Sequence, residues 1–241
     1  MKNINKYKFL TFIPARSGSV GIKNKNIKKI GKKSLLEHTL NFIKKIKLKN
    51  NFIYVSTDSK VYMNLLKKFS LSSDLLRSKK NSKSNSKIES SVFEFLNHHS
   101  IKKKKLIFDY IILLLPTQPL RSVNLFKKSL RLLNDNSKGI ISLKNLDRSS
   151  KYIFRVDNKK ILIKDKLTST NRQYIKTNYT PCGCFYIVKF SEFIKYKSFF
   201  IPKMNYAISK FPDNIDIDSY NDLKLAEVIY SNKKIFKSVS S

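Results

Sequence analysis

The chain has 241 residues, 41% of them hydrophobic and 12% aromatic, which is enough to bury a sizeable core and excludes disorder throughout. Its two cysteines are too few and too closely spaced for a disulfide scaffold or a zinc finger. The sequence shows neither a signal peptide nor an apolar run long enough to cross a bilayer, so a cytoplasmic protein is expected rather than a membrane protein. The formal net charge is +34, but the lysines are scattered over every segment, so the charge favours an anionic substrate without locating its site.

Short apolar runs alternate with amphipathic segments over the first part of the chain. The runs predict strands, and the segments with apolar residues three and four apart predict helices. The Lys/Asn/Ser-rich stretch 79–87 is expected to be a mobile loop. Because strands and helices alternate, we predict an α/β fold with a largely parallel sheet. The strands are expected at 9–13, 52–55, 109–115 and 139–143, and the helices at 34–47, around 61–66, at 88–96 and at 125–133.

The pattern changes from residue 152 onward. Residues 152–156 and 161–163 flank an Asp157-Asn158 turn and predict a hairpin outside the sheet. Further strands are expected at 184–188 and 206–209, and a last helix at 223–229 follows a segment, 219–222, that has the form of a capping box. The sequence shows no internal repeat, and no linker that would separate two domains.

The loop after the first strand is the first segment with chemical content. Ligands of open α/β sheets bind at the carboxyl ends of the strands, where this loop is expected. Gly18 and Gly21 let the backbone come close to a ligand, and Arg16 and Lys25 supply positive charge suited to a triphosphate. No Gly-Lys-Ser/Thr sequence closes the loop, so it is not a Walker A motif. An ordinary Gly/Ser turn with surface lysines is the alternative.

Two carboxylates stand close together near the C-terminus. Asp216 and Asp218 are one residue apart in a segment expected to be extended, so their side chains should point the same way. Such a pair can share a hard cation whose remaining ligands are substrate phosphates. The alternative is helix capping by Asp218 or Ser219, which does not exclude metal binding.

Five blocks, in order along the chain, resemble the acylneuraminate cytidylyltransferases, a family of CMP-sugar synthetases. The resemblance implies a single domain over 1–241 with a three-layer, Rossmann-like nucleotide-diphospho-sugar transferase fold. It also implies a mostly parallel sheet with a β-rich dimerisation excursion at about 145–200. The blocks are Ile13–Asn26, Val55–Ser59, Leu114–Arg121, Arg172-Gln173 with Cys182–Tyr186, and Asp216 and Asp218 with Asp222.

The resemblance also implies roles for individual residues. It assigns Arg16, Lys25 and Asp218 to catalysis and Asp216 and Asp218 to a magnesium ion. Nucleotide binding falls to Ala15, Arg16, Ser17, Gly18, Lys25, Asn26, Arg77 and Ser86. Binding of the sugar falls to Gln118, Arg172, Tyr186, Phe199 and Phe200, for the last two of which core packing is the alternative.

The implied reaction joins CMP from CTP to the anomeric hydroxyl of an acidic nine-carbon or eight-carbon sugar and releases pyrophosphate. Both reactants are anionic, so cation supply is the main catalytic demand. No histidine occupies an obvious position for a base, and we expect metal-assisted or carboxylate-assisted deprotonation of the hydroxyl. The resemblance implies a homodimer and gives no reason to expect a nucleic-acid or membrane partner.

Three positions depart from the family pattern. Val20 replaces a lysine beside the phosphates, Leu115 replaces a glutamine near the sugar, and Cys182 replaces an asparagine. The change at Val20 should weaken stabilisation of the triphosphate, for which Lys23 can partly substitute. The changes at Leu115 and Cys182 affect the choice of sugar more than the type of reaction. Two other functions stay open: a degenerate nucleotide-binding homologue without activity, and a basic nucleic-acid-binding protein suggested by the net charge.

Overall fold

The computed structural model describes residues 4–71, 75–98, 102, 106–146, 155–157, 160–162, 178–232 and 235–236. Six strands form one sheet in the order β10-β6-β9-β5-β1-β4. Within it β9 runs antiparallel to both neighbours, while the other paired strands are parallel. The strands are β1 (Phe9–Pro14), β4 (Asn51–Ser56), β5 (Tyr110–Leu113), β6 (Gly139–Leu146), β9 (Asn178–Lys189) and β10 (Asn205–Ile208).

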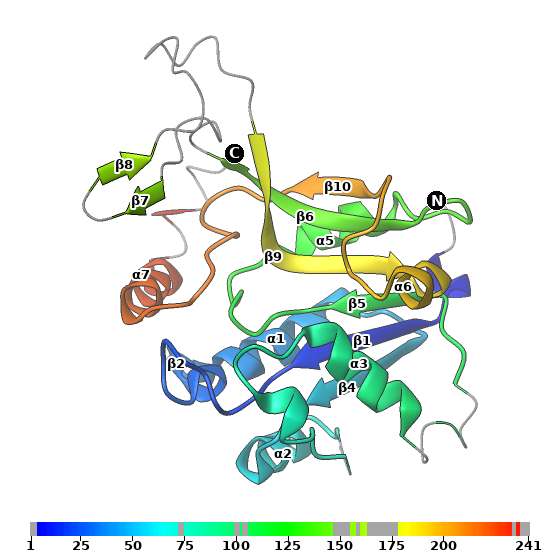
Figure 1. The fold of residues 1–241 in the computed structure, drawn as a ribbon, viewed down its shortest axis with the longest axis horizontal. Coiled ribbons are helices and arrows are strands. Elements are labelled where there is room, and N and C mark those ends of the chain that lie inside the picture. The colour runs from blue at the N-terminus through cyan, green and yellow to red at the C-terminus, as the bar shows by residue number, and fades with distance from the viewer. Residues whose placement is uncertain are drawn as a thin grey trace.

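Helices cover both faces of this sheet and complete three layers (Figure 1). The helices are α1 (Leu35–Ile46), α2 (Lys60–Lys67), α3 (Ile88–Asn97), α5 (Val123–Leu130), α6 (Phe190–Tyr196) and α7 (Tyr220–Ser231). Shorter elements are the 3-10 turns η1 (Ile4–Lys6), η2 (Lys25–Ile27) and η3 (Lys80–Ser82), the pair β2 (Lys29–Ile30) and β3 (Lys33–Ser34), and the hairpin β7 (Arg155–Asp157) and β8 (Lys160–Leu162).

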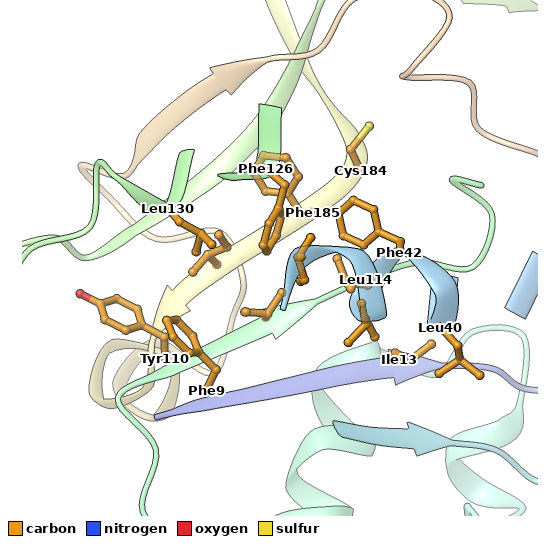
Figure 2. Packing of buried hydrophobic residues seen from close by; sticks show 14 of the residues in the cluster. Phe9, Ile13, Leu40, Phe42, Tyr110, Leu114, Phe126, Leu130, Cys184 and Phe185 are labelled. Atoms are coloured by element: carbon orange, nitrogen blue, oxygen red, sulfur yellow. The ribbon is translucent and has the colours of Figure 1, made fainter. Parts of the chain in front are cut away.

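Alternating side chains of the strands build two cores. On β1, Phe9 and Ile13 face the core shared with α1, α2 and α5, whereas Leu10 and Phe12 face the one shared with α3 and α6. In the first core, the ring of Phe126 packs edge-on against Phe42 and Phe185 (Figure 2). Helix α7 belongs to a third, smaller cluster with Ile22, Ile30 and Ile217.

The expected fold class is confirmed, as are the strands and helices expected from the sequence, with shifts at their ends. Ser34 and Ser219 begin α1 and α7 with capping boxes, the second as expected. The expected hairpin is present as β7 and β8; residues 152–154 and 163 lie outside the described residues. The stretch 79–87 is irregular apart from η3, and hydrogen bonds to α3 hold it, so a loop was expected correctly but its anchoring was not.

The segment 145–200, expected as a dimerisation excursion, contributes both to the separate hairpin β7–β8 and to the main sheet. Its second half is not outside the sheet: β9 is a central strand, and α6 packs on the same face as α3. Residues 147–154 and 163–177 lie outside the described part of the chain. The long strand β9 bends at a register shift opposite Ile141 and Leu143, where Gly183 adopts a φ of +77° that favours glycine.

Candidate active site

A cleft of about 400 Å³ lies at the carboxyl ends of the parallel strands β1, β4 and β5. Three segments that are far apart in the sequence form its walls: the loop after β1, residues 115–117 after β5, and Asp218 before α7. Residues between η3 and α3 close a fourth side. The lining residues are Pro14, Arg16, Ser19, Val20, Gly21, Lys25, Asn26, Arg77, Ser86, Ile88, Leu115, Pro116, Thr117 and Asp218.

The loop after β1 and the aspartate segment are in direct contact. A Cβ at Gly21 would lie 2.4 Å from the backbone oxygen of Asp218, so only glycine allows this approach. Gly18, by contrast, is exposed and has no atom within 4 Å of a Cβ position, which leaves room for a ligand. The backbone N–H groups of Ala15, Ser17 and Ser19 donate to acceptors within the protein, so these three amides are not free to bind a phosphate.

Lys25 joins the loop to the aspartate segment. Its Nζ donates to Asp218 Oδ1 and to the carbonyl oxygen of Ile217, both at 2.9 Å. The side chain of Lys25 is largely buried, whereas that of Asp218 is 77% exposed toward solvent and the cleft. The basic loop and the acidic segment that the sequence singled out therefore meet in the structure. The ammonium of Lys25 and the carboxylate of Asp218 lie at one edge of the cleft.

Asp216 lies deeper than Asp218. Its Oδ1 is buried and has no hydrogen-bond partner among the described residues. Burial raises the pKa of Asp216, and the nearby negative charge of Asp218 adds to this shift, while Thr117 opposes it. The fully buried Ile217 between them gives the alternation of an extended segment. Thr117 and Gln118 thus act on this carboxyl, but its Oδ1 keeps a free acceptor position that a hard cation can use.

The two carboxylates fit Mg²⁺ in type and number. Mg²⁺ is bound in nucleotide sites through one or two carboxylates, with water and phosphate oxygens completing its shell. No group of three or more His, Cys, Asp or Glu side chains suited to a metal occurs within the described residues. A cation at this pair would therefore depend on oxygens of the substrate.

Arg16 and Arg77 bring positive charge to the cleft from opposite walls. Arg16 Nη1 donates to Gly18 O at 2.7 Å and to Ser82 O at 3.4 Å, linking the loop to the wall near η3. Arg77 is buried, which lowers the pKa of its guanidinium, and the charges of Asp58 and Glu94 oppose that shift. Asn26 is buried, and its Nδ2 donates to Arg16 O. Ser86 lines the cleft, and its hydroxyl donates to Lys80 O.

The described residues that were expected to bind the sugar lie outside the lining of the cleft. Gln118 is fully buried: its Nε2 donates to Cys182 O of β9 at 2.6 Å, and its amide also lies beside Asp216, where it opposes the upward shift of the carboxyl pKa. Tyr186, Phe199 and Phe200 are packed together, and Phe200 is 57% exposed. None of these four lines the cleft described above. Arg172 lies outside the described residues.

Burial raises the pKa of Tyr186 to about 12, with further contributions from Cys182 and Asp216. Its hydroxyl is therefore within electrostatic reach of the aspartate segment, although Tyr186 belongs to the core on the α3 side. Phe199 is 2% exposed and packs in this core, whereas Phe200 is exposed beside it.

Sequence reasoning missed two charged residues near the cleft, although both lie in blocks it had singled out. Asp58, which follows β4, accepts hydrogen bonds from Ser17. Arg121 is buried, donates to Leu115 O and stacks its guanidinium over Phe42. Burial lowers the pKa of Arg121 to about 10, and the thiol of Cys184 and the carboxyl of Asp216 oppose this. The signal available was a charged residue at the end of an apolar block.

The three departures from the family pattern occupy different environments. Val20 is 82% exposed at the rim of the cleft, and Leu115 lines it. Cys182 is buried, and neither it nor Cys184 reaches the cleft. Two of the three changes therefore alter surfaces that a ligand in the cleft would meet.

A glycine-containing loop, basic side chains and paired carboxylates thus meet at the carboxyl edge of a mostly parallel sheet, which defines a nucleotide-binding α/β protein. Residues 10–235 match the cytidylyltransferase family model, and the chain belongs to this family. Within the described residues no helix has the length and apolar character needed to span a membrane.

Two curated relatives cover most of the chain. A CMP-N,N'-diacetyllegionaminic acid synthase of Legionella pneumophila is 26% identical over 223 residues, covering 91% of this chain and 95% of the relative. An N-acylneuraminate cytidylyltransferase of Escherichia coli O18:K1:H7 is 28% identical over 235 residues, covering 94% of this chain and 53% of the relative. The chain therefore spans about half the length of the second relative.

Solved structures share the fold. A CMP:2-keto-3-deoxy-manno-octonic acid synthetase in complex with CTP is similar with a TM-score of 0.66 at 12% identity, covering 94% of this chain and 99% of the other. A 4-diphosphocytidyl-2C-methyl-D-erythritol synthase from Anaerococcus prevotii gives a TM-score of 0.61 at 20% identity, covering 93% and 99%. At these identities the likeness supports the nucleotidyltransferase fold alone.

Proposed function

We propose that this protein transfers CMP from CTP to the anomeric hydroxyl of a nonulosonic acid, a sialic acid-like sugar, and releases pyrophosphate. The observation that carries the proposal is the contact between Lys25 of the loop after β1 and Asp218, at one edge of a cleft of about 400 Å³. Both relatives named above are synthases or cytidylyltransferases of such sugars, which supports this class of acceptor.

Different residues of the cleft are proposed to bind the triphosphate and the nucleoside. Lys25 and Arg16 are placed to hold the triphosphate and to stabilise the charge that develops on pyrophosphate as the bond between the α-phosphorus and its bridging oxygen breaks. Asn26, whose side chain fixes the backbone of Arg16, supports the same loop. Arg77 and Ser86 form the wall against which the nucleoside is proposed to lie.

The attacking hydroxyl must lose its proton as its oxygen bonds to the α-phosphorus. His38 is buried with Nε2 2.9 Å from Ile30 O, and no histidine is among the described residues that line the cleft. Asp218 is the carboxylate that lines it within the same part of the chain, and we assign it to this step.

Asp216 and Asp218 are the residues proposed to hold Mg²⁺, which when bound supplies positive charge to phosphate oxygens. The buried, unpartnered Oδ1 of Asp216 supports this assignment. We further propose a cytoplasmic homodimer without a nucleic-acid or membrane partner, in which Tyr186, Phe199 and Phe200 contribute to the sugar side. Surface-glycan biosynthesis is the pathway that this acceptor class suggests.

The test is release of pyrophosphate by the purified protein with CTP, Mg²⁺ and a panel of nonulosonic and eight-carbon acids. We expect release with CTP and at least one acid, and none with CTP alone. Silence across the panel together with tight binding of CTP would indicate a degenerate homologue. No binding of CTP, together with salt-sensitive binding of single-stranded DNA, would favour the nucleic-acid alternative.

A further inference from the structure

Asp58 makes the closest contact between the end of β4 and the loop after β1. Its Oδ1 accepts a hydrogen bond of 2.7 Å from the backbone N–H of Ser17, and its Oδ2 accepts one of 3.2 Å from Ser17 Oγ. Both oxygens are thus engaged by one residue of the loop. Because β1 and β4 are parallel and paired up to Pro14 and Ser56, this contact lies at the carboxyl edge of the sheet.

Arg77 places a positive charge within electrostatic reach of Asp58. Arg77 is buried, its backbone N–H donates to Thr57 O at 2.8 Å, and the charge of Asp58 is the strongest influence that opposes the effect of burial on its guanidinium. A carboxylate beside a triphosphate site is unfavourable unless donors neutralise it. Here a backbone amide and a hydroxyl, both of Ser17, donate to the carboxylate, and the positive charge of Arg77 lies within electrostatic reach.

The same loop is held from a second direction. Arg16 donates to Gly18 O, one residue beyond the amide that Asp58 binds, and also to Ser82 O on the opposite wall. Neither Ser17 nor Asp58 lines the cleft, whereas Arg16, which precedes Ser17, and Ser19, two residues after it, do. Asp58 therefore acts on the loop without contacting the cleft itself.

We propose that Asp58 is a positioning residue: its two hydrogen bonds fix the loop after β1 at Ser17, so that the triphosphate meets a preformed loop. The inference rests on the proposed function, since it concerns the affinity for CTP. Pre-organised groups bind an anion more tightly because no ordering is needed on binding.

The test compares Asp58→Asn, which is isosteric and keeps an acceptor for the Ser17 amide, with Asp58→Ala, which removes both acceptors. Asp109→Asn is the control, because Asp109 Oδ2 accepts from Lys8 N at 2.7 Å at the opposite end of the sheet. We expect the Kd for CTP to rise at least about tenfold in Asp58→Ala and less in Asp58→Asn, with no change in Asp109→Asn. The KM for CTP should rise while the KM for the sugar stays constant.

Hydrogen exchange of the loop amides supplies a readout that does not depend on turnover. We expect the peptide covering residues 14–20 to exchange faster in both Asp58 variants than in the wild type, and to be unchanged in Asp109→Asn. Wild-type CTP affinity in both Asp58 variants, or unchanged exchange, would overturn the inference alone. A wild-type protein that does not bind CTP would overturn the proposed function as well. If Asp58→Ala does not fold, the comparison of Asp58→Asn with Asp109→Asn decides.

Discussion

A substitution of Asp218 can test its proposed role at the cleft without unfolding the protein. It pairs with Lys25, and it is the proposed ligand and proton acceptor at the cleft, yet its side chain is mostly exposed. Because Asp218 is exposed to solvent although Lys25 is largely buried, and asparagine can still accept from Lys25, a substitution of Asp218 should affect the chemistry more than the fold.

We expect Asp218→Asn to lower turnover at least about a hundredfold, the scale seen on removing one key electrostatic stabiliser. Asparagine keeps an acceptor for Lys25, so the melting temperature should stay close to that of the wild type. Asp135→Asn is the control, because Asp135 pairs with Lys6 at the surface, away from the cleft. Pyrophosphate release at saturating CTP measures the effect; undiminished turnover in Asp218→Asn would exclude the assigned role.

Val20 offers a gain-of-function test at the rim of the same cleft. Its side chain is 82% exposed, so a lysine fits without repacking and should change stability by no more than about 0.5 kcal/mol. Because the family has a lysine here, we expect Val20→Lys to lower the KM for CTP severalfold through added attraction to the phosphates. Val61→Lys, also exposed but on α2, controls for the added charge. An equal change in both variants would mean that only net charge matters.

Among single residues, the sequence predicted those whose charged side chains line the cleft. It missed Asp58, which contacts the loop after β1 and not the cleft. Arg16, Lys25 and Asp218 were expected at one site and lie there. Asp58 was not singled out, because its partner is a backbone amide on a neighbouring strand, and no pattern of residue types marks that contact. Gln118 was expected to bind the sugar from its motif, which stays a prediction; near the bend of β9 at Gly183 its amide donates to Cys182 O, and it also acts on Asp216.

Helix α3 carries one wall of the cleft through Glu94. The carboxylate accepts hydrogen bonds of 2.9 Å from Ser78 N and Asn81 Nδ2, which holds the segment that contains η3. Burial raises the pKa of Glu94, but these hydrogen bonds outweigh it, and the net shift is downward from 4.5. The deprotonated form is therefore favoured by folding.

Since the folded-state pKa is depressed, the contribution of Glu94 to stability is present above the unfolded value of 4.5 and is lost as pH falls through the folded value. Glutamine cannot accept from both donors, so we expect Glu94→Gln to lower the free energy of unfolding by about 1–2 kcal/mol at neutral pH. The difference should shrink as pH is lowered to about 3. Urea unfolding across this range measures it, with exposed Glu227→Gln on α7 as control. A difference that stays constant with pH would contradict the ionic origin.

At the level of elements, periodicity predicted those that bury one face, and failed where tertiary contacts decide. The helix α6 has only seven residues and was not expected; its buried Phe193 packs with Phe93 and Phe199 on the α3 side of the sheet. The strand β9 is longer than its apolar run, because its first residues pair with the polar end of β6. That it would insert between β6 and β5 depends on pairing that no local pattern encodes.

The whole molecule carries a formal charge of +34, while the described residues contain three ion pairs between side chains. Few attractive pairs stand against many repulsive ones, so self-repulsion dominates the electrostatic contribution to stability. The same field raises the local concentration of anions such as CTP near the cleft. Salt should therefore act on stability and on binding in opposite directions.

We expect the melting temperature to rise and the affinity for CTP to fall as NaCl increases from about 0.05 M to about 0.5 M, because the screening length drops from about 14 Å to about 4 Å. Differential scanning fluorimetry and calorimetric titration measure the two effects. Cytidine, which has the base and ribose but no phosphate, is the matched ligand, and its weaker binding should change little with salt. A melting temperature that falls with salt would mean that ion pairs such as Lys25–Asp218 outweigh the repulsion. Equal salt dependence for cytidine and CTP would mean that the field does not act through the phosphates.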